Sequence, residues 1–426
     1  MAPGTLARLV PATAGALGML RAVVCGFFLL SILLTDFAAL SRLPATVMRP
    51  TGAMQIFSWQ FYERLLTPQG MPALKALLVA SLLFGAVGYL TPLTTKCAAA
   101  LVLFYEGLLR SFGHFNHDEM LAVYVLVVLA FTPSGDAFSV DSLPDSNTER
   151  RGEVKYGYPV LLMRALVAWA YFSSALVKLR VAGLEYFGPD SLPALAVSHS
   201  LDNLHDARFA YAFRLAEYRG PLTTAAVALV LAWELLFPLA IFLRRARRLI
   251  LGFGLVFHVA TLFLMNFFFP FHLAMYAVFV DWPAVARRVS QAPLIKRLAR
   301  WWGEFRGVPE SFPCVRVEEC VARETLLWDG DCGFCARWVE RLRHFARRPF
   351  EAQPYQSIET ELPTEVARWT KAQMHWVDGI GRVYGGSRAL ARVLAASGHT
   401  FLAALLESKP LRPFAWLGYR IAARNR

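Results

Sequence analysis

The first two thirds of the chain alternate between long apolar stretches and short polar connections. Eight apolar stretches stand out, at residues 15–40, 73–92, 94–111, 119–133, 157–178, 222–243, 248–267 and 269–282. A helix needs about 20 apolar residues to cross a bilayer, and several of these stretches reach that length. We therefore expect a polytopic α-helical membrane domain with about eight spans over residues 1–285. Its first span is predicted to be a retained helix, because its apolar core is longer than that of a signal peptide.

The pattern changes after residue 282, where charged residues become frequent. Residues 286–321 are predicted to be a polar linker along the membrane interface, followed by a folded domain over 322–426. In that domain residues 324–329 predict a strand and residues 333–347 a helix. Further strands are expected at 350–356, at 374–378 and at 381–384, the last two forming a hairpin, and a further helix at 387–396. This order predicts a small α/β domain.

Composition supports the membrane assignment. Hydrophobic residues make up 56% of the chain and charged residues 18%, which is unlike an ordinary soluble protein. The net charge of +13 raises the question of nucleic-acid binding. However, the Lys and Arg residues gather at the ends of apolar stretches and form no basic stripe with interleaved aromatics. We expect the lipid bilayer as a partner and no nucleic acid.

Basic residues also predict the orientation. One short connection contains Arg244, Arg245, Arg247 and Arg248, which the positive-inside tendency places in the cytoplasm. With eight spans, the basic segments around Arg150 and over residues 287–306 fall on the same side. The protein is therefore expected in the cell membrane, as a multi-pass protein with a cytoplasmic C-terminal domain.

The best candidate for chemistry is the dithiol Cys332-Gly-Phe-Cys335, at the start of a predicted helix. Two cysteines at this spacing can close a small disulfide ring, and a helix N-terminus favours the thiolate of the first one. We expect Cys332 to be the nucleophile and Cys335 the resolving thiol. A zinc half-site and a structural cysteine pair are the alternatives. Zinc needs four ligands and the nearby Cys314 and Cys320 have an unusual spacing, so no metal is expected.

Several short motifs in this domain resemble the DCC family of predicted thiol-disulfide oxidoreductases. They are Trp328-Asp-Gly-Asp-Cys-Gly-Phe-Cys335, Tyr355-Gln356, Val377-Asp-Gly379, Val383-Tyr-Gly-Gly-Ser387 and the closing segment 419–426. The resemblance covers the whole domain and implies a thioredoxin-like fold. The family's Asp-Cys-x-x-Cys element begins here at Asp331, to which we assign a binding role beside the dithiol.

The membrane part resembles, in the order and spacing of its motifs, the membrane domain of vitamin K-dependent gamma-glutamyl carboxylase, the HTTM group. The motifs are Asn116-His-Asp-Glu-Met-Leu121, Phe138-Ser-Val-Asp-Ser-Leu143, Tyr171-Phe-Ser-Ser-Ala-Leu-Val-Lys-Leu179 and Gly254-Leu-Val-Phe-His258. The resemblance implies that Lys178 is a base acting on a reduced quinone, with His117 in the same active site. We assign binding roles to Asn116 and His258, and a quinone is the candidate cofactor.

The same residues also have simpler interpretations. By position alone, Lys178 is a lysine near the end of an apolar helix whose charge reaches the headgroups, and each histidine is as well explained by helix packing. His114, Glu234, Asn266 and His272 are further polar residues in or near the spans, where such groups usually face a cavity or a partner. We therefore expect a buried polar cluster.

These observations predict a membrane-anchored thiol-disulfide oxidoreductase, with thioredoxin-like reductants or protein disulfides as partners. Carboxylation itself is disfavoured, because the dithiol domain follows here where the carboxylase has a large substrate-handling region. Two alternatives stay open. One is a quinone-dependent carboxylase- or epoxidase-like enzyme centred on Lys178 and His117. The other is a non-enzymatic membrane carrier or anchor with a redox-sensing domain.

Overall fold

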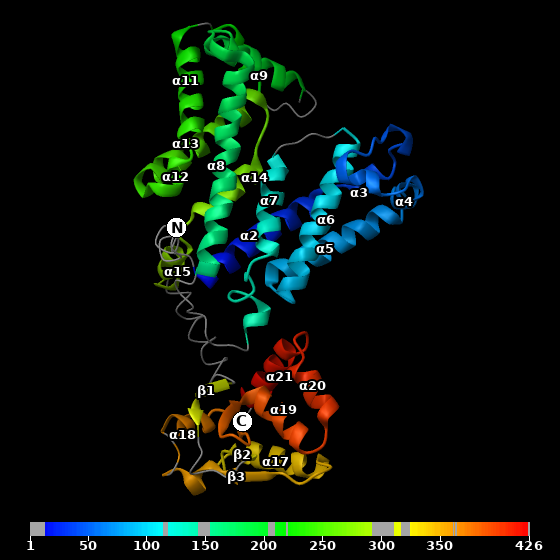
Figure 1. Ribbon diagram of the computed structural model, residues 1–426, viewed down its shortest axis with the longest axis vertical. Helices are drawn as coiled ribbons and strands as arrows, with labels where there is room; N and C mark the ends of the chain where they lie inside the picture. The colour runs from blue at the N-terminus through cyan, green and yellow to red at the C-terminus, as the bar shows by residue number, and fades with distance from the viewer. Residues whose placement is uncertain are drawn as a thin grey trace. The chain divides into compact units, whose positions relative to one another are not determined.

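The computed structural model describes residues 13–113, 118–143, 154–202, 209–218, 220–291, 311–316, 324–360, 362 and 364–424 (Figure 1). Contacts within the chain divide it into two units. The first consists of Met1–Gly135 and Glu149–Trp282, and the second of Asp136–Thr148 and Pro283–Arg426. The first unit is helical, and the second contains the sheet.

Each apolar stretch of the sequence forms a helix in the helical unit. The helices are α2 (Ala14–Leu34), α5 (Gly70–Val87), α6 (Thr91–Ser111), α7 (Asp118–Ala130), α8 (Val154–Ala182), α11 (Pro221–Leu236), α13 (Arg244–Met265) and α14 (Pro270–Met275) with the 3-10 turn η6 (Tyr276–Phe279). Among the described helices, five are long and apolar enough to cross a membrane: α2, α5, α6, α8 and α13. The helices α11 and α14 with η6 are apolar but shorter. Several helices thus fit a membrane domain, and the number of eight spans stays a prediction.

Short helices fill the longer connections of this unit. They are α3 (Phe37–Leu40), η1 (Ala45–Val47), η2 (Gly52–Ile56), α4 (Trp59–Leu65), η4 (Gly183–Phe187), α9 (Ser191–Asp202), α10 (Tyr211–Ala216) and α12 (Leu239–Phe242). The turn η3 (Val140–Ser142) follows α7, and α15 (Trp282–Gln291) follows η6.

Buried polar side chains tie these helices together. Arg21 of α2 is fully buried and donates to the backbone carbonyls of Ser134, at 2.6 Å, and Ala86, at 3.4 Å. Asn266 ends α13 in the left-handed conformation, and its side chain bonds both backbone groups of Phe209. Carbonyls near helix ends lack intrahelical donors, which explains why a buried guanidinium is accommodated there. Asn266 therefore serves the fold.

The second unit is built on a mixed five-stranded sheet in the order β1-β5-β4-β2-β3. Its strands are β1 (Ser311–Arg316), β2 (Thr325–Trp328), β3 (Glu351–Pro354), β4 (His375–Val377) and β5 (Arg382–Gly385). The pair β2 and β3 is parallel and the other pairs are antiparallel. Its helices are α17 (Gly333–Phe345), η7 (Tyr355–Ile358), α18 (Thr364–Thr370), α19 (Gly386–Ala396), α20 (Thr400–Glu407) and α21 (Arg412–Arg424). The predicted strands β2 to β5 and helices α17 and α19 are confirmed.

Strand β1 lies inside the segment 286–321, which we expected to be a linker. It pairs with the edge of β5, with Ser311 opposite Tyr384, and its register shifts between Phe312 and Arg316. The strand contains Pro313, which sequence patterns associate with loops and sheet edges. Pairing with β5, more than 60 residues later, decides its conformation.

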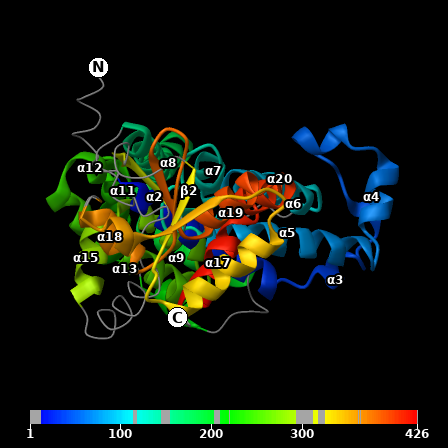
Figure 2. The ribbon, with the colours of Figure 1, turned by 90° about the horizontal axis from the view of Figure 1, so that it is seen from below.

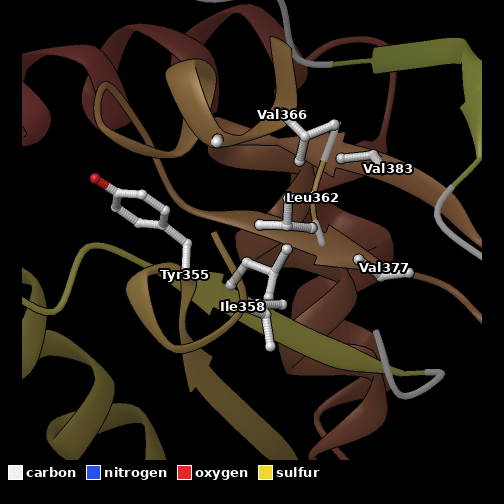
Figure 3. Close-up of a cluster of buried hydrophobic side chains, with 8 residues drawn as sticks. Tyr355, Ile358, Leu362, Val366, Val377 and Val383 are labelled. Atoms are coloured by element: carbon white, nitrogen blue, oxygen red, sulfur yellow. The ribbon is translucent and has the colours of Figure 1, made fainter. Parts of the chain in front are cut away.

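The two faces of the sheet carry different helices. Leu326 and Trp376 point to the face covered by α17 and α19, where Val339 and Val393 pack. The next residue on each strand, Leu327 and Val377, points to the other face, because side chains alternate along a strand. There they meet Tyr355 and Ile358 of η7, Val366 of α18, and Leu362 between these two elements (Figure 3). Figure 2 shows α18 and α17 on opposite sides of β2. The unit is therefore a three-layered domain with a core on each face of its sheet.

Candidate dithiol site

Cys332 lies where the chain leaves the sheet and enters α17. Strand β2 ends at Trp328, the turn Asp329-Gly330-Asp331 follows, and Cys332 is the N-cap of α17. Its backbone N–H donates to the Asp329 carbonyl at 3.2 Å, and its Sγ accepts the N–H of Cys335 at 3.3 Å. The sulfur thus takes the acceptor position of a capping side chain, at the positive end of the helix dipole.

The two cysteines differ in exposure. Cys332 is partly exposed, whereas Cys335 on the first turn of α17 is only 1% exposed. A disulfide of another molecule therefore reaches Cys332 and not Cys335.

The turn before Cys332 is held by Gln356, which follows β3. Its amide nitrogen donates to the carboxylates of Asp329, at 2.6 Å, and Asp331, at 3.2 Å, and its amide oxygen accepts the N–H of Gly330 at 2.9 Å. A Cβ at Gly330 would lie 3.0 Å from Pro354 and 3.1 Å from Gln356, so this close approach favours glycine. No role was predicted for Gln356 from the sequence, although it belongs to the Tyr355-Gln356 motif of the DCC family resemblance.

Tyr355, the neighbour of Gln356, is fixed from the opposite face of the sheet. It is 3% exposed in the core under α18, and the Lys371 ammonium lies 5.9 Å from its ring centroid. The Tyr355 phenol, and then the Glu359 carboxylate, raise the pKa of Lys371. The backbone that carries Gln356 is thereby anchored in a buried cluster.

An apolar groove of about 180 Å³ adjoins the buried cysteine. Phe334, Cys335 and Trp338 of α17 form one wall, and residues of α19, α20 and α21 complete it. Tyr419 of α21 accepts the backbone N–H of Met374 at 3.1 Å, which fastens α21 to the start of β4. Neither α20 nor α21 was predicted from the sequence, so the groove was not expected.

Among the described residues, no three His, Cys, Asp or Glu side chains form a group that could hold a metal ion. Cys320 lies outside the described residues, and for Cys314 on β1 the structure describes the backbone alone.

Lys178, the second predicted site, contacts a carboxylate inside the helical unit. Its Nζ lies 2.5 Å from Oε1 of Glu234 on α11, and Ser174 donates to the same oxygen at 3.3 Å. The side chain of Glu234 is 4% exposed and that of Lys178 27%. The second oxygen of Glu234 is buried with no hydrogen-bond partner among the described residues. Lys178 is therefore half of an ion pair rather than an isolated headgroup anchor.

His258 belongs to an aromatic and polar cluster between α7, α8, α13 and α14. Its Nε2 lies 2.8 Å from the Tyr171 hydroxyl, and its ring centroid 6.0 Å from that of His272. His272 in turn contacts the buried Asp118 carboxylate at 2.6 Å through Nδ1. The structure thus brings His258 and His272 together, as the sequence analysis expected of a polar cluster. His114, Asn116 and His117 lie outside the described residues.

The comparisons with known proteins concern the dithiol domain. The model of the DCC1-like thiol-disulfide oxidoreductase family matches residues 326–426, from β2 to the end of the chain. Neither the curated proteins nor the solved structures gave a match. The C-terminal unit therefore carries a DCC1-like thiol-disulfide oxidoreductase domain, and this supports an oxidoreductase in general. It follows a helical region whose apolar helices indicate membrane association.

Proposed function

We propose that the protein is a membrane-anchored thiol-disulfide oxidoreductase in which Cys332 attacks and Cys335 resolves. One observation carries the proposal: a partly exposed sulfur caps α17 while the second sulfur is buried on the first helical turn. The match of this segment to the DCC1-like family supports the same chemistry.

The reaction follows from these positions. The Cys332 thiolate attacks one sulfur of a partner disulfide, so that a mixed disulfide forms and the partner's other sulfur leaves as a thiolate. Cys335 loses its proton and attacks the Cys332 sulfur, which releases the partner's second thiolate and closes the Cys332–Cys335 disulfide. The dithiol has then given two electrons to the partner, and protons from water neutralise the released thiolates. The reverse sequence oxidises a partner dithiol.

We assign the domain to the thioredoxin-like fold. The support is its topology, in which β2, α17 and β3 form a parallel βαβ unit and β4 and β5 add an antiparallel hairpin next to β2. The strand order β5-β4-β2-β3, with α17 and α19 on one face and α18 on the other, is the arrangement of a minimal thioredoxin-like domain.

The orientation and partners are part of the proposal. The basic connection that begins α13 favours a cytoplasmic dithiol domain by the positive-inside tendency. In that compartment thioredoxin-like reductants, or disulfides of cytoplasmic proteins, are suitable exchange partners for Cys332.

The test is a redox titration of the full-length protein in lipid nanodiscs. Glutathione buffers set the potential, and differential alkylation with mass spectrometry measures the free thiol at Cys332 and Cys335 separately. We expect both thiols to titrate together as one two-electron couple between about −300 and −100 mV. Thiols that stay reduced at every potential, or that titrate independently, would contradict the proposal.

The contact between Lys178 and Glu234 favours a second candidate, an HTTM-type membrane unit that binds a quinone. In it Lys178 and the buried Glu234 carboxylate, 2.5 Å from its Nζ, would lie beside the quinone, and the pair would supply the group that accepts a proton from a reduced quinone. The two candidates separate by mutation, because Cys332→Ser would remove disulfide exchange and leave quinone chemistry intact.

A further inference from the structure

Helices α20 and α21 expose large apolar side chains to solvent. Phe401 is 76% exposed, Phe414 56% and Ile421 53%, and Leu405 and Leu417 are also exposed. On α21 the positions 414, 417 and 421 have the spacing of one helix face. We call these five exposed residues of two consecutive helices the apolar face of α20–α21.

This face takes no part in the core of the domain. Helix α21 buries Pro413, Trp416 and Arg420 on another side, and α20 buries Ala403. Because separate residues attach the helices to the domain, the exposed side chains are not needed for packing. Large exposed apolar surfaces usually mark an interaction site.

The charges beside the apolar face are mostly positive. Lys409 and Arg424 are exposed, whereas Arg420 is buried and Arg412 lines a pocket with the one acidic residue of the segment 400–424, Glu407. Glu407 pairs with Arg392 of α19 at 3.3 Å, so its charge is neutralised within the domain. Apolar side chains next to basic ones match the two layers of an anionic membrane surface, where acyl chains lie below phosphate groups.

The same chain carries helices that fit a membrane. Five described helices are long and apolar enough to cross a membrane, and α15 begins with Trp282 directly after them. We propose that the apolar face of α20–α21 rests on a bilayer that contains anionic lipids. Its aromatic and aliphatic side chains insert among the headgroups, and Lys409 and Arg424 lie beside the phosphates.

Docking in this way affects the dithiol, a consequence that rests on the proposed function. The groove beside Cys335 is lined by Ala415, Gly418 and Ala422, which occupy the side of α21 next to Leu417 and Ile421. The dithiol then lies at the boundary between lipid and water and exchanges with disulfides held at the membrane surface.

The experiment uses full-length protein in nanodiscs that contain a phosphatidylcholine with a photoactivatable diazirine on its acyl chain. One set of discs is otherwise neutral and the other contains phosphatidylglycerol. After illumination, lipid adducts are mapped by mass spectrometry. We expect adducts on peptides within 400–424, at least about fivefold more of them in anionic discs, because each basic contact contributes roughly that factor. Adducts on α13 serve as the internal reference.

The variant Phe414→Ser/Leu417→Ser/Ile421→Ser should lose the adducts in 400–424 and keep those on α13. Ile380→Ser, which removes an apolar side chain of similar exposure on the β4–β5 turn, is the matched control and should keep both. Protection of Cys335 from alkylation verifies that each variant is folded. Where the triple variant does not fold, Lys409→Gln/Arg424→Gln leaves the apolar face intact and should remove the preference for anionic discs.

The proposal is wrong if peptides 400–424 of the wild-type protein carry no lipid adducts. It is also wrong if a crosslinker joins them instead to the chain's own helices or to a second copy of the chain. The readout is lipid contact and is repeated with Cys332→Ser, so a failure of docking and a failure of the redox function are distinguished.

Discussion

The amide of Gln356 donates a hydrogen bond of 2.6 Å to the carboxylate of Asp329, although the two residues are 27 positions apart in the chain. The contact depends on the parallel pairing of β2 and β3, in which Trp328 is opposite Pro354. Because both strands end at the same edge of the sheet, the residue after β3 reaches the turn after β2. Gln356 thereby positions the loop that presents Cys332.

Replacing Gln356 by Leu should slow disulfide exchange about tenfold while the domain stays folded. The substitution removes the hydrogen bonds to Asp329, Gly330 and Asp331, and bonds of this kind contribute about 1–3 kcal/mol when charged groups accept them. The two carboxylates, without their donor, also disfavour a negative charge on the nearby sulfur. The reduction potential should therefore become more negative, because a stabilised reduced form is what makes a dithiol oxidising.

The matched control for this prediction is Gln353→Leu. Gln353 lies on β3 and its amide donates to the Ser357 hydroxyl at 3.1 Å, away from the turn before Cys332. We expect no change in its exchange rate or potential. Equal effects of the two variants would show that Gln356 acts through general stability rather than through the Cys332 loop.

Substituting the two cysteines one at a time should affect disulfide exchange in different ways. Cys332→Ser removes the exposed sulfur and should abolish exchange with a model disulfide. Cys335→Ser leaves the first attack intact and removes the resolving step, so a mixed disulfide on Cys332 should accumulate. Mass spectrometry after incubation with oxidised glutathione measures the adduct; an adduct that forms equally well on Cys332→Ser would refute the assigned roles.

Leu327→Ala should destabilise the dithiol domain by about 2–5 kcal/mol, because it leaves a cavity in a well-packed core. Leu327, on β2, is fully buried and packs against residues of η7 and α18. Hydrogen exchange of peptides from β2 and β4 in the full-length protein measures the loss. Ile380→Ala, at a position 55% exposed, should change stability by less than about 0.5 kcal/mol.

The pair of Lys178 and Glu234 should behave as a coupled unit. Lys178→Met leaves the buried Glu234 carboxylate without its cation and should cost about 3–5 kcal/mol, whereas Lys178→Met/Glu234→Leu should cost less than the first change alone. Thermal unfolding in nanodiscs provides the comparison. Additive effects of the single substitutions Lys178→Met and Glu234→Leu would show that the ion pair contributes nothing of its own.

Much of the dithiol domain could be predicted from local pattern. The strand before Cys332, the helix after it and the β4–β5 hairpin each have a signal within a few residues; in the hairpin, Asp378 accepts the N–H groups of Ile380 and Arg382, and Gly381 has a positive φ. The eight apolar stretches could also be identified from the sequence, because a helix that lies in lipid requires a continuous apolar segment.

The contacts that complete each site were not readable, because they join residues distant in sequence. Polar residues near the spans, including Glu234, stood out in the sequence, but that Glu234 would meet Lys178, 56 positions earlier, depends on how α8 and α11 pack. Strand β1 has no strand pattern of its own and forms by pairing with β5.

The sequence by itself determined the division into an apolar helical region and a dithiol domain, and the place of Cys332 and Cys335 at a helix start. Periodicity and spacing are local properties, and the physics of helices and strands acts on them directly. Only the tertiary structure decided that Cys335 is buried while Cys332 is reachable. The packing of the chain also decided that Gln356 holds the turn between β2 and Cys332, and that α20 and α21 leave an apolar face uncovered. Burial and long-range hydrogen bonds depend on which surfaces meet, and that is decided when the whole chain packs.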